Sequence, residues 1–356
     1  MSRFIQLHML TSYPPANLNR DDLGRPKTAI MGGAQRLRIS SQCLKRTWRT
    51  SPVVEEALKG NLGQRTRRMG RVLLGNLLEK GIDKEKAVAC TSALVEFFGT
   101  IEKPKKGDDK PKEEKLLDIK ELFFFSPEEK KAMEEMALRY LEEGKLPTEK
   151  DSKEIMGQTQ TAVDLALFGR MVAKQPAYNV EAAAQVAHAL SVHEVAVEED
   201  FFSAVDELNE GEEDMGAGHI GETEFAAGYF YLYACINYDL LVKNLGGDRE
   251  LADKGIRAFV EAMATSAPKG KINSFGSYAY TSYCLAEKGS RQPRSLSVSF
   301  LNPVKSKNML TEAISALENT RDDMDAAYGP CAEDSYVMNV PERKGTLPEL
   351  LDFIAG

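Results

Sequence analysis

The sequence has few of the residues and segments that mark secreted, metal-binding or membrane-spanning proteins. It contains five cysteines, none of them in a CxxC pair, and four histidines, none of them in an HExxH motif. No apolar run is long enough to cross a bilayer, and the first residues do not show the basic-then-apolar order of a signal peptide. We therefore expect a cytoplasmic protein that has no metal site, needs no cofactor and does not bind membranes.

One long stretch of the chain also lacks positive charge. Between residues 175 and 242 there is no Lys or Arg, whereas there are 14 Asp or Glu. Residues 1–71 show the opposite, with 14 Lys or Arg and four acids, although the whole chain has a net charge of −8. A cationic end on an acidic body indicates a localised site for a polyanion. The alternative is an uneven distribution of charge over the surface.

The start of the chain predicts two strands and a helix around a long loop. Residues 3–12 alternate between apolar and polar side chains, as in a strand with one buried face. Residues 13–34 are rich in Pro, Gly and Asn and predict a loop. Residues 35–39 alternate again, and we expect Ser40 or Ser41 to cap a helix that continues to about residue 58.

The rest of the chain predicts a helical middle flanked by strands. Residues 103–112 predict a solvated linker, and residues 201–218 predict a hairpin arm with an acidic tip. Further strands are expected near 227–241, 272–285 and 294–301. Helices are expected near 65–80, 83–98, 127–143, 149–168, 181–194, 248–265, 306–318 and 345–354. This order indicates an α+β fold interrupted by a helical insertion.

The main candidate site lies in residues 36–49. In the strand, Arg36 and Arg38 are expected on one side, opposite two apolar residues. In the helix, the spacing predicts a polar, cationic stripe on the face opposite the apolar Leu44 and Trp48. The stripe consists of Gln42, Lys45, Arg46 and Arg49.

Phosphate is the ligand that this segment fits best. Ser40 and Ser41 place hydroxyl and backbone N–H groups at the start of the helix, where the helix dipole favours anions. Arg20, Arg25 and Lys27, in the preceding loop, can close over the same place. These groups can bind phosphate oxygens and make no base-specific contacts. The alternative is an ordinary amphipathic helix with a hydrated face.

Two further patches are weaker candidates for binding. Residues 168–174 hold two cations beside Met171, and a glycine lets backbone approach a ligand closely; a buried Met is the alternative. The members of this patch are Gly169, Arg170, Met171 and Lys174. Phe202 and Ser203 lie at the base of the expected arm, where an aromatic ring can stack on a base or pack partly in the core.

Asp21 and Asp22 are the strongest catalytic candidates in the sequence. Two carboxylates beside basic residues can bind Mg²⁺ or act as a base near an RNA phosphate. The alternative is an acidic pair that orders Arg20, Arg25 and Lys27 through salt bridges. One pair supplies too few carboxylates for a divalent cation site, so we favour the alternative and expect a protein that is not an enzyme.

The sequence resembles the CasC family, the major backbone subunits of type I-E CRISPR Cascade surveillance complexes. The resemblance is most specific in residues 18–22 (LNRDD), 29–33 (AIMGG) and 38–46 (RISSQCLKR). It continues in residues 163–171 (VDLALFGRM) and 218–228 (GHIGETEFAAG).

The resemblance implies an RRM-like (ferredoxin-like) palm with inserted helical fingers and a hairpin thumb. Residues 1–59, 181–194 and 224–356 would form the palm, residues 60–180 the fingers and residues 195–223 the thumb. Copies would line up head to tail along the CRISPR RNA, beside other Cascade subunits. Each would bind the RNA backbone and present the guide to a target DNA strand in antiviral defence.

The resemblance also implies which residues contact RNA. They are Arg20, Lys27, Ser40, Gln42, Lys45, Arg46, Arg49, Met171, Phe202, Ser203 and Lys271. The residue patterns described above add Arg38, Ser41, Gly169 and Arg170. Related backbone subunits of type III complexes cut RNA from a loop aspartate in this region. A metal-dependent ribonuclease of a type III-like complex, using Asp21 and Asp22, therefore remains the alternative function.

Overall fold

The structure is a computed structural model that describes residues 3–102, 117–157, 161–172, 174–204 and 219–355. The linker expected at 103–112 and the acidic tip of the expected arm lie outside the described residues. The chain divides into two compact units. Unit 1 comprises residues 1–56, 185–237 and 256–356, and unit 2 comprises residues 57–184 and 238–255.

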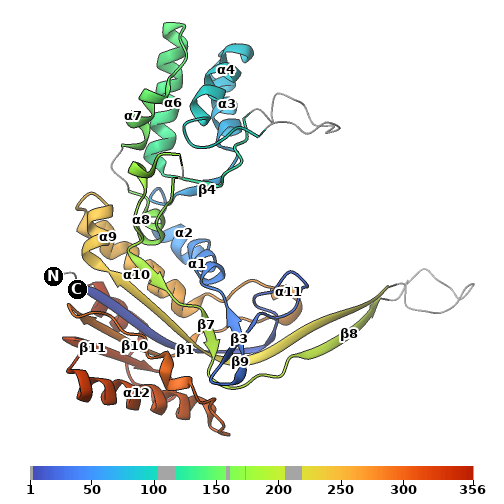
Figure 1. The fold of residues 1–356 in the computed structure, drawn as a ribbon, viewed down its shortest axis with the longest axis vertical. Coiled ribbons are helices and arrows are strands. Elements are labelled where there is room, and N and C mark those ends of the chain that lie inside the picture. Colours follow the sequence, from blue (N-terminus) through green and yellow to red (C-terminus); the bar gives the residue numbers. More distant parts are fainter. Residues whose placement is uncertain (1–2, 103–116, 158–160, 173, 205–218, 356) are drawn as a thin grey trace, which may run out of the picture. The chain divides into compact units, whose positions relative to one another are not determined.

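Unit 1 is built on one antiparallel sheet, and Figure 1 labels most of its strands. The strand order is β11-β10-β1-β9-β7-β3-β2, and β6 and β8 also pair with β9. The strands are β1 (Phe4–Ala16), β2 (Thr28–Met31), β3 (Ala34–Ile39), β6 (Ala184–Val186), β7 (Ala189–Ser191), β8 (Glu198–Ala204), β9 (His219–Asn237), β10 (Thr281–Gly289) and β11 (Asp334–Asn339). The mixed content of helix and antiparallel sheet confirms the predicted α+β class.

Unit 1 also contains helices and a short 3-10 turn. They are α1 (Ser41–Arg49), α2 (Pro52–Ala57), α10 (Arg249–Thr265), α11 (Ile272–Phe275), α12 (Met309–Tyr328), α13 (Leu347–Ala355) and η3 (Ser297–Phe300). The helix α10 belongs to unit 1 from residue 256 on. Leu317 of α12 and Phe300 of η3 pack with Leu10, Tyr231 and Tyr283 of the central strands. This apolar cluster forms the core on one face of the sheet.

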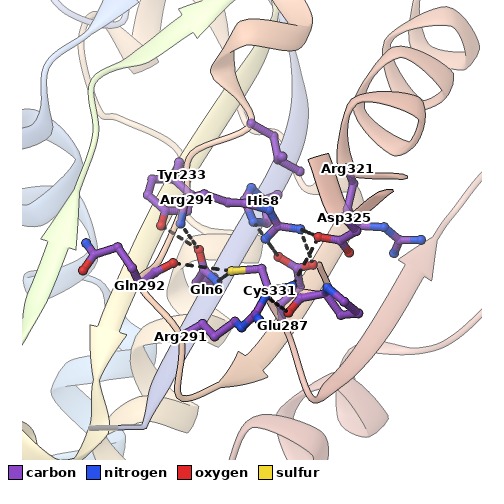
Figure 2. Close-up of polar contacts among 12 residues, drawn as sticks. Gln6, His8, Tyr233, Glu287, Arg291, Gln292, Arg294, Arg321, Asp325 and Cys331 are labelled. Carbon is purple, nitrogen blue, oxygen red and sulfur yellow. Dashed lines mark hydrogen bonds and ion pairs between the residues drawn. The ribbon is translucent and has the colours of Figure 1, made fainter. Parts of the chain in front are cut away.

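The strand β1 is buried on both faces, so the prediction of one exposed polar face is wrong. Gln6 and His8 are buried and belong to the polar network drawn in Figure 2. Tyr233 Oη donates to Gln6 Oε1 at 3.0 Å. His8 Nδ1 lies 2.8 Å from Tyr231 Oη, and its Nε2 lies 3.3 Å from Glu287 Oε2.

Unit 2 is mostly helical. Its longest helix, α6 (Pro127–Glu143), begins at a capping box in which Ser126 and Glu129 bond each other's backbone N–H. Met133 and Met136 of α6 pack with Leu73 and Leu94 in the core. The other elements are α3 (Met69–Glu79), α4 (Lys84–Val95), α7 (Ser152–Met156), α8 (Val163–Phe168), α9 (Tyr238–Asn244), η1 (Glu149–Asp151), η2 (Pro176–Tyr178) and the strand pair β4 (Gln64–Thr66) and β5 (Phe123–Phe125).

Several predicted elements are wrong. Residues 181–194 form β6 and β7 instead of a helix, because pairing with β9 and β3 outweighs the helical propensity of their alanines. Residues 294–301 contain η3 instead of a strand, and β10 begins only at Thr281. The helix expected to reach residue 58 breaks before Pro52, and the helix expected over 149–168 is three short ones. The strands β2 and β11 were not predicted.

Candidate nucleic-acid interface

The helix α1 has the cap and the two faces that the sequence predicts. Ser40 is the N-cap, and its Oγ accepts a hydrogen bond from Cys43 N at 3.3 Å. Leu44 and Trp48 are 1% exposed, whereas Gln42 and Arg46 are exposed. Lys45, Arg49 and Ser41 are half-buried. The first turn contains no acidic residue, so no carboxylate there opposes an anion.

Two asparagines hold the loop before β2 in place, and one of them bonds the start of α1. Asn17 Nδ2 donates to the carbonyl oxygens of Gly24 and Glu224, each at 2.9 Å. Asn19 Oδ1 accepts from Ser40 N at 2.9 Å, and Asn19 O accepts from Lys27 N at 2.8 Å. Backbone and side-chain bonds therefore order the loop beside the helix cap.

Asp21 orders this loop through backbone groups. Its Oδ1 accepts from the N–H groups of Leu23 and Arg25, each at 2.9 Å. Arg25 instead forms an ion pair with Glu224, with 3.0 Å between Nε and Oε1. The predicted salt bridges to the acidic pair are therefore wrong for Arg25. Over the described ranges, no group of three His, Cys, Asp or Glu side chains is placed to hold a metal ion.

An open groove of about 610 Å³ lies between this loop and α1. We call it the cationic groove, because Arg20, Arg46 and Lys269 line it. Asp21 and Asp22 line it too. Its other lining residues are Leu18, Asn19, Gly24, Cys43, Thr47, Thr50 and Gly270. The structure thus brings two of the predicted RNA contacts, Arg20 and Arg46, to one open volume.

Sequence reasoning did not select Lys269. Its place depends on Gly270, where a Cβ would lie 2.4 Å from the carbonyl oxygen of Leu18. A glycine between two lysines was the signal, since only Gly lets the chain pass so close to another backbone. The predicted contact Lys271 takes a left-handed backbone conformation, with φ of 47°, and its Nζ bonds Thr223 Oγ1 on β9.

The two arginines of β3 do not share one surface, so that prediction is wrong. Arg36 is buried, and its guanidinium donates to the carbonyl oxygens of Ser191 at 3.0 Å and Phe300 at 2.8 Å. Arg38 is half-buried, and its Nη1 lies 3.3 Å from Nδ1 of His188. Arg36 is therefore a structural residue, and Arg38 is the arginine of this strand that reaches the surface.

The described part of the expected arm is the hairpin of β8 and β9. Phe202 pairs with Gly221 across the two strands, and a Cβ on Gly221 would lie 2.4 Å from the Phe202 ring. The ring therefore lies over the glycine, with Phe202 and Ser203 both exposed. Lys271 bonds Thr223 on the same hairpin, so these three residues belong to one region of unit 1.

The patch at residues 169–171 lies in unit 2, and its members differ in exposure. Met171 is 83% exposed, so the alternative of a buried Met is wrong. Arg170 is buried, and its Nη1 donates to the Glu129 carboxylate at 2.7 Å and to Phe124 O at 2.9 Å. Gly169 has a φ of +75°, and a Cβ there would lie 2.8 Å from Val180 O. The glycine thus turns the chain and presents Met171.

A family model described as CT1975-like protein, of the Cas group, matches residues 5–350. The chain belongs to this family. A chain of a "CRISPR RNA-guided surveillance complex, pre-nicking" is similar to it, with 28% identity, a TM-score of 0.84 and 99% coverage of both chains. A chain of a second "CRISPR RNA-guided surveillance complex" has 25% identity and a TM-score of 0.62, and the match covers 99% of this chain and 98% of that one. A comparison with curated proteins found no match.

These matches confirm the resemblance to the CasC subunits and give the CT1975-like chain a role of the Cascade type. The match extends over both units, since it covers nearly the whole chain. None of the described helices has both the length and the apolar content of a membrane span.

Proposed function

We propose that this chain binds single-stranded CRISPR RNA along its phosphate backbone, as a repeated, non-catalytic subunit of a Cascade-type complex. The observation that carries the proposal is the cationic groove, where three cations, Arg20, Arg46 and Lys269, outnumber the acids Asp21 and Asp22 in one open volume of an acidic protein. A polyanion is the ligand that such a concentration of charge attracts. The similar structures support RNA as that polyanion, since both are described as chains of RNA-guided complexes.

The start of α1 supplies the groups for phosphate. Ser40 caps the helix, and the N–H groups of the first turn carry partial positive charge. The side chains that we assign to backbone contacts are hydroxyls, an amide and cations, which bind phosphate oxygen whatever the base. They are Arg20, Lys27, Arg38, Ser40, Ser41, Gln42, Lys45, Arg46 and Arg49.

We assign the sheet of unit 1 to an RRM-like palm, the β8–β9 hairpin to a thumb and unit 2 to the fingers. Phe202 and Ser203 would meet a displaced base at the thumb, with Lys271 beside them. Exposed Met171 suits insertion between bases, positioned by Gly169. Arg170 is the least supported contact, because its guanidinium already bonds Glu129 inside unit 2.

Copies of this chain would then stack head to tail along one RNA. A filament requires two different, complementary surfaces on each copy. The cationic residues 1–71 and the acidic residues 175–242 provide opposite charges for such a contact. Other Cascade subunits would end the filament, and the guide bases would remain open to pair with a target DNA strand.

Binding to unrelated single-stranded RNAs over a series of salt concentrations tests the proposal. Affinity is expected to be similar for all sequences and to fall with salt, by about 0.7 log units per log unit of salt for each neutralised phosphate. A strong preference for one sequence together with a flat salt response would contradict the proposal.

The alternative, a metal-dependent ribonuclease that uses Asp21 and Asp22, has less support. Asp21 Oδ1 already accepts two backbone hydrogen bonds, and an Mg²⁺ site takes carboxylates that are available as ligands. Incubating the protein with complementary RNA and Mg²⁺ separates the two functions. Intact RNA supports the binding subunit, and cleavage that Asp22→Asn abolishes supports the ribonuclease.

A further inference from the structure

His188 lies beside two cations at the edge of the predicted RNA site. It is exposed, between β6 and β7. Its Nδ1 lies 3.3 Å from Nη1 of Arg38, and Arg38 pairs with Leu190 of β7. The strand pairing therefore fixes the histidine and the arginine beside each other. The sequence predicted a helix at this place and gave His188 no part in binding.

The contact with Arg38 fixes the protonation state of His188. A guanidinium has only N–H donors, so Nδ1 of the imidazole must accept the hydrogen bond. The ring is then neutral and carries its proton on Nε2. Partial loss of water around the ring, and after it the charges of Arg38 and Lys27, lower the pKa of His188 below its usual value.

Lys27 and Arg38 are tied to the site at the start of α1. Lys27 O accepts from Arg38 N at 2.7 Å, and Lys27 N donates to Asn19 O at 2.8 Å. The side chain of the same asparagine accepts from Ser40 N, at the helix cap. A short chain of hydrogen bonds thus connects the surroundings of His188 with the helix cap that we assign to phosphate.

We propose that His188 is part of the RNA-binding surface and takes up a proton from solvent when an RNA phosphate binds beside Lys27 and Arg38. This inference rests on the proposed function. A phosphate offsets the two positive charges that act on the ring, so the imidazolium becomes favourable. Because protonated Nδ1 no longer accepts from Arg38, the guanidinium is released and donates to phosphate instead.

The test is the pH dependence of RNA affinity in the wild type and in His188→Gln. Glutamine keeps an oxygen that accepts from Arg38, but it does not titrate. Affinity for a short mixed-sequence RNA is measured at fixed salt between about pH 6 and pH 8, the range in which histidines titrate. Calorimetry in two buffers with different heats of ionisation counts the protons taken up.

His193→Gln is the matched control. His193 lies in the same segment, but its Nδ1 donates to Glu194 O at 2.8 Å and its Nε2 accepts from Tyr229 N at 3.2 Å. Both ring nitrogens are therefore occupied by backbone groups within unit 1. We expect this variant to keep the pH dependence of the wild type.

Wild-type affinity is expected to rise as the pH falls, by at most about tenfold per pH unit for one linked proton. In His188→Gln, this dependence and the proton uptake are expected to disappear while RNA binding at pH 8 persists. If both proteins bind RNA with the same pH dependence, the inference about His188 is wrong and the proposed function stands. If the wild type binds no RNA at any pH, both are wrong.

Discussion

The buried network around Glu287 and the cationic groove both contain arginines, but these arginines are paired differently. In the buried network, Arg294 bonds the Glu287 carboxylate at 2.7 and 3.2 Å and Asp325 at 3.0 Å (Figure 2). In the groove, neither Arg20 nor Arg46 forms an ion pair with a described residue. The first arrangement neutralises charge within the fold, and the second leaves Arg20 and Arg46 without an ion-pair partner among the described residues.

Burial explains why the two regions contribute differently to stability. A charge removed from water is costly unless a partner offsets it, so the buried network must be complete. Charges that face water cost little and contribute little to stability. Changes at Glu287 should therefore alter folding without altering RNA affinity, and changes at Arg20 or Arg46 should do the reverse.

The largest effect is expected from Glu287→Ala. The change leaves Arg294 and His8 without their shared carboxylate, and removing one partner of a buried pair costs about 3–5 kcal/mol. Denaturant unfolding measures the loss. The control is Asp352→Ala, which removes the partner of Arg257 at 2.7 Å in an exposed pair and should cost at most about 1 kcal/mol. Equal losses would show that the network around Glu287 does not depend on its ion pairs.

The same network predicts how stability depends on pH. Burial alone raises the pKa of Glu287, but hydrogen bonds from His8 and Arg294 lower it to about 2, from 4.5. Burial lowers the pKa of His8 below 6.5, more than Glu287 raises it. In both cases the unfolded chain binds the proton more readily, so acid favours unfolding. The free energy of unfolding should fall as the pH drops below 6.5, and most steeply between 4.5 and about 2.

Thermal or denaturant unfolding at several pH values checks this prediction. In Glu287→Gln, the part of the loss that falls between 4.5 and about 2 should become smaller, because the titrating carboxylate is gone. A stability that stays constant from neutral pH to pH 3 would contradict the assignment.

In the groove, Arg20→Ala combined with Arg46→Ala should weaken RNA binding and leave the fold intact. Each of the two lost cation–phosphate contacts is worth roughly 1–2 kcal/mol, so we expect affinity to fall by about 30- to 1,000-fold. Both side chains are exposed, so stability should change by at most about 0.5 kcal/mol. Filter binding and thermal unfolding measure the two quantities.

Trp48→Ala provides the opposite-face control on the same helix. Trp48 is 1% exposed, and truncating a buried aromatic costs about 3–5 kcal/mol. The protein that remains folded should bind RNA with wild-type affinity. If instead the double arginine variant unfolds and the tryptophan variant is stable, the assignment of the two faces of α1 is wrong.

The sequence predicts those features of the groove and the buried network that depend on residues close together in the chain. The cap at Ser40 and the two faces of α1 depend on residues within one helix, and the structure confirms both. The burial of Arg36 was not predictable, because its acceptors at Ser191 and Phe300 are distant in the sequence. The position of Lys269 in the groove was also not predictable, because it depends on the close approach of Gly270 to Leu18, which is distant in the sequence.

Mistakes about secondary structure had a similar cause. The segment 181–194 contains alanines that favour a helix and valines that favour a strand. The segment forms strands because it pairs with β9 and β3, and the sequence does not reveal this pairing. Because of that error, the contact of His188 with Arg38 was not predicted, since a helix would not have placed the histidine ring beside β3. Charge asymmetry, in contrast, is visible in the sequence without any structure, and most residues that line the groove come from the cationic residues 1–71.

The smallest effect is expected where acidic residues lie close to the cationic loop. Glu198, Glu199 and Asp200 are exposed on β8, and Glu199 pairs with Glu224, which already bonds Arg25. If these acids attract the cationic residues of the next copy, replacing all three with Ala should shorten the oligomers on a fixed RNA at low salt. At high salt the variant and the wild type should match, because at about 1 M salt exposed charges separated by more than about 3 Å are largely screened. Sedimentation measures the lengths. Equal lengths at both salt concentrations would show that apolar contacts and the shared RNA hold the copies together, and that the acids only repel stray nucleic acid.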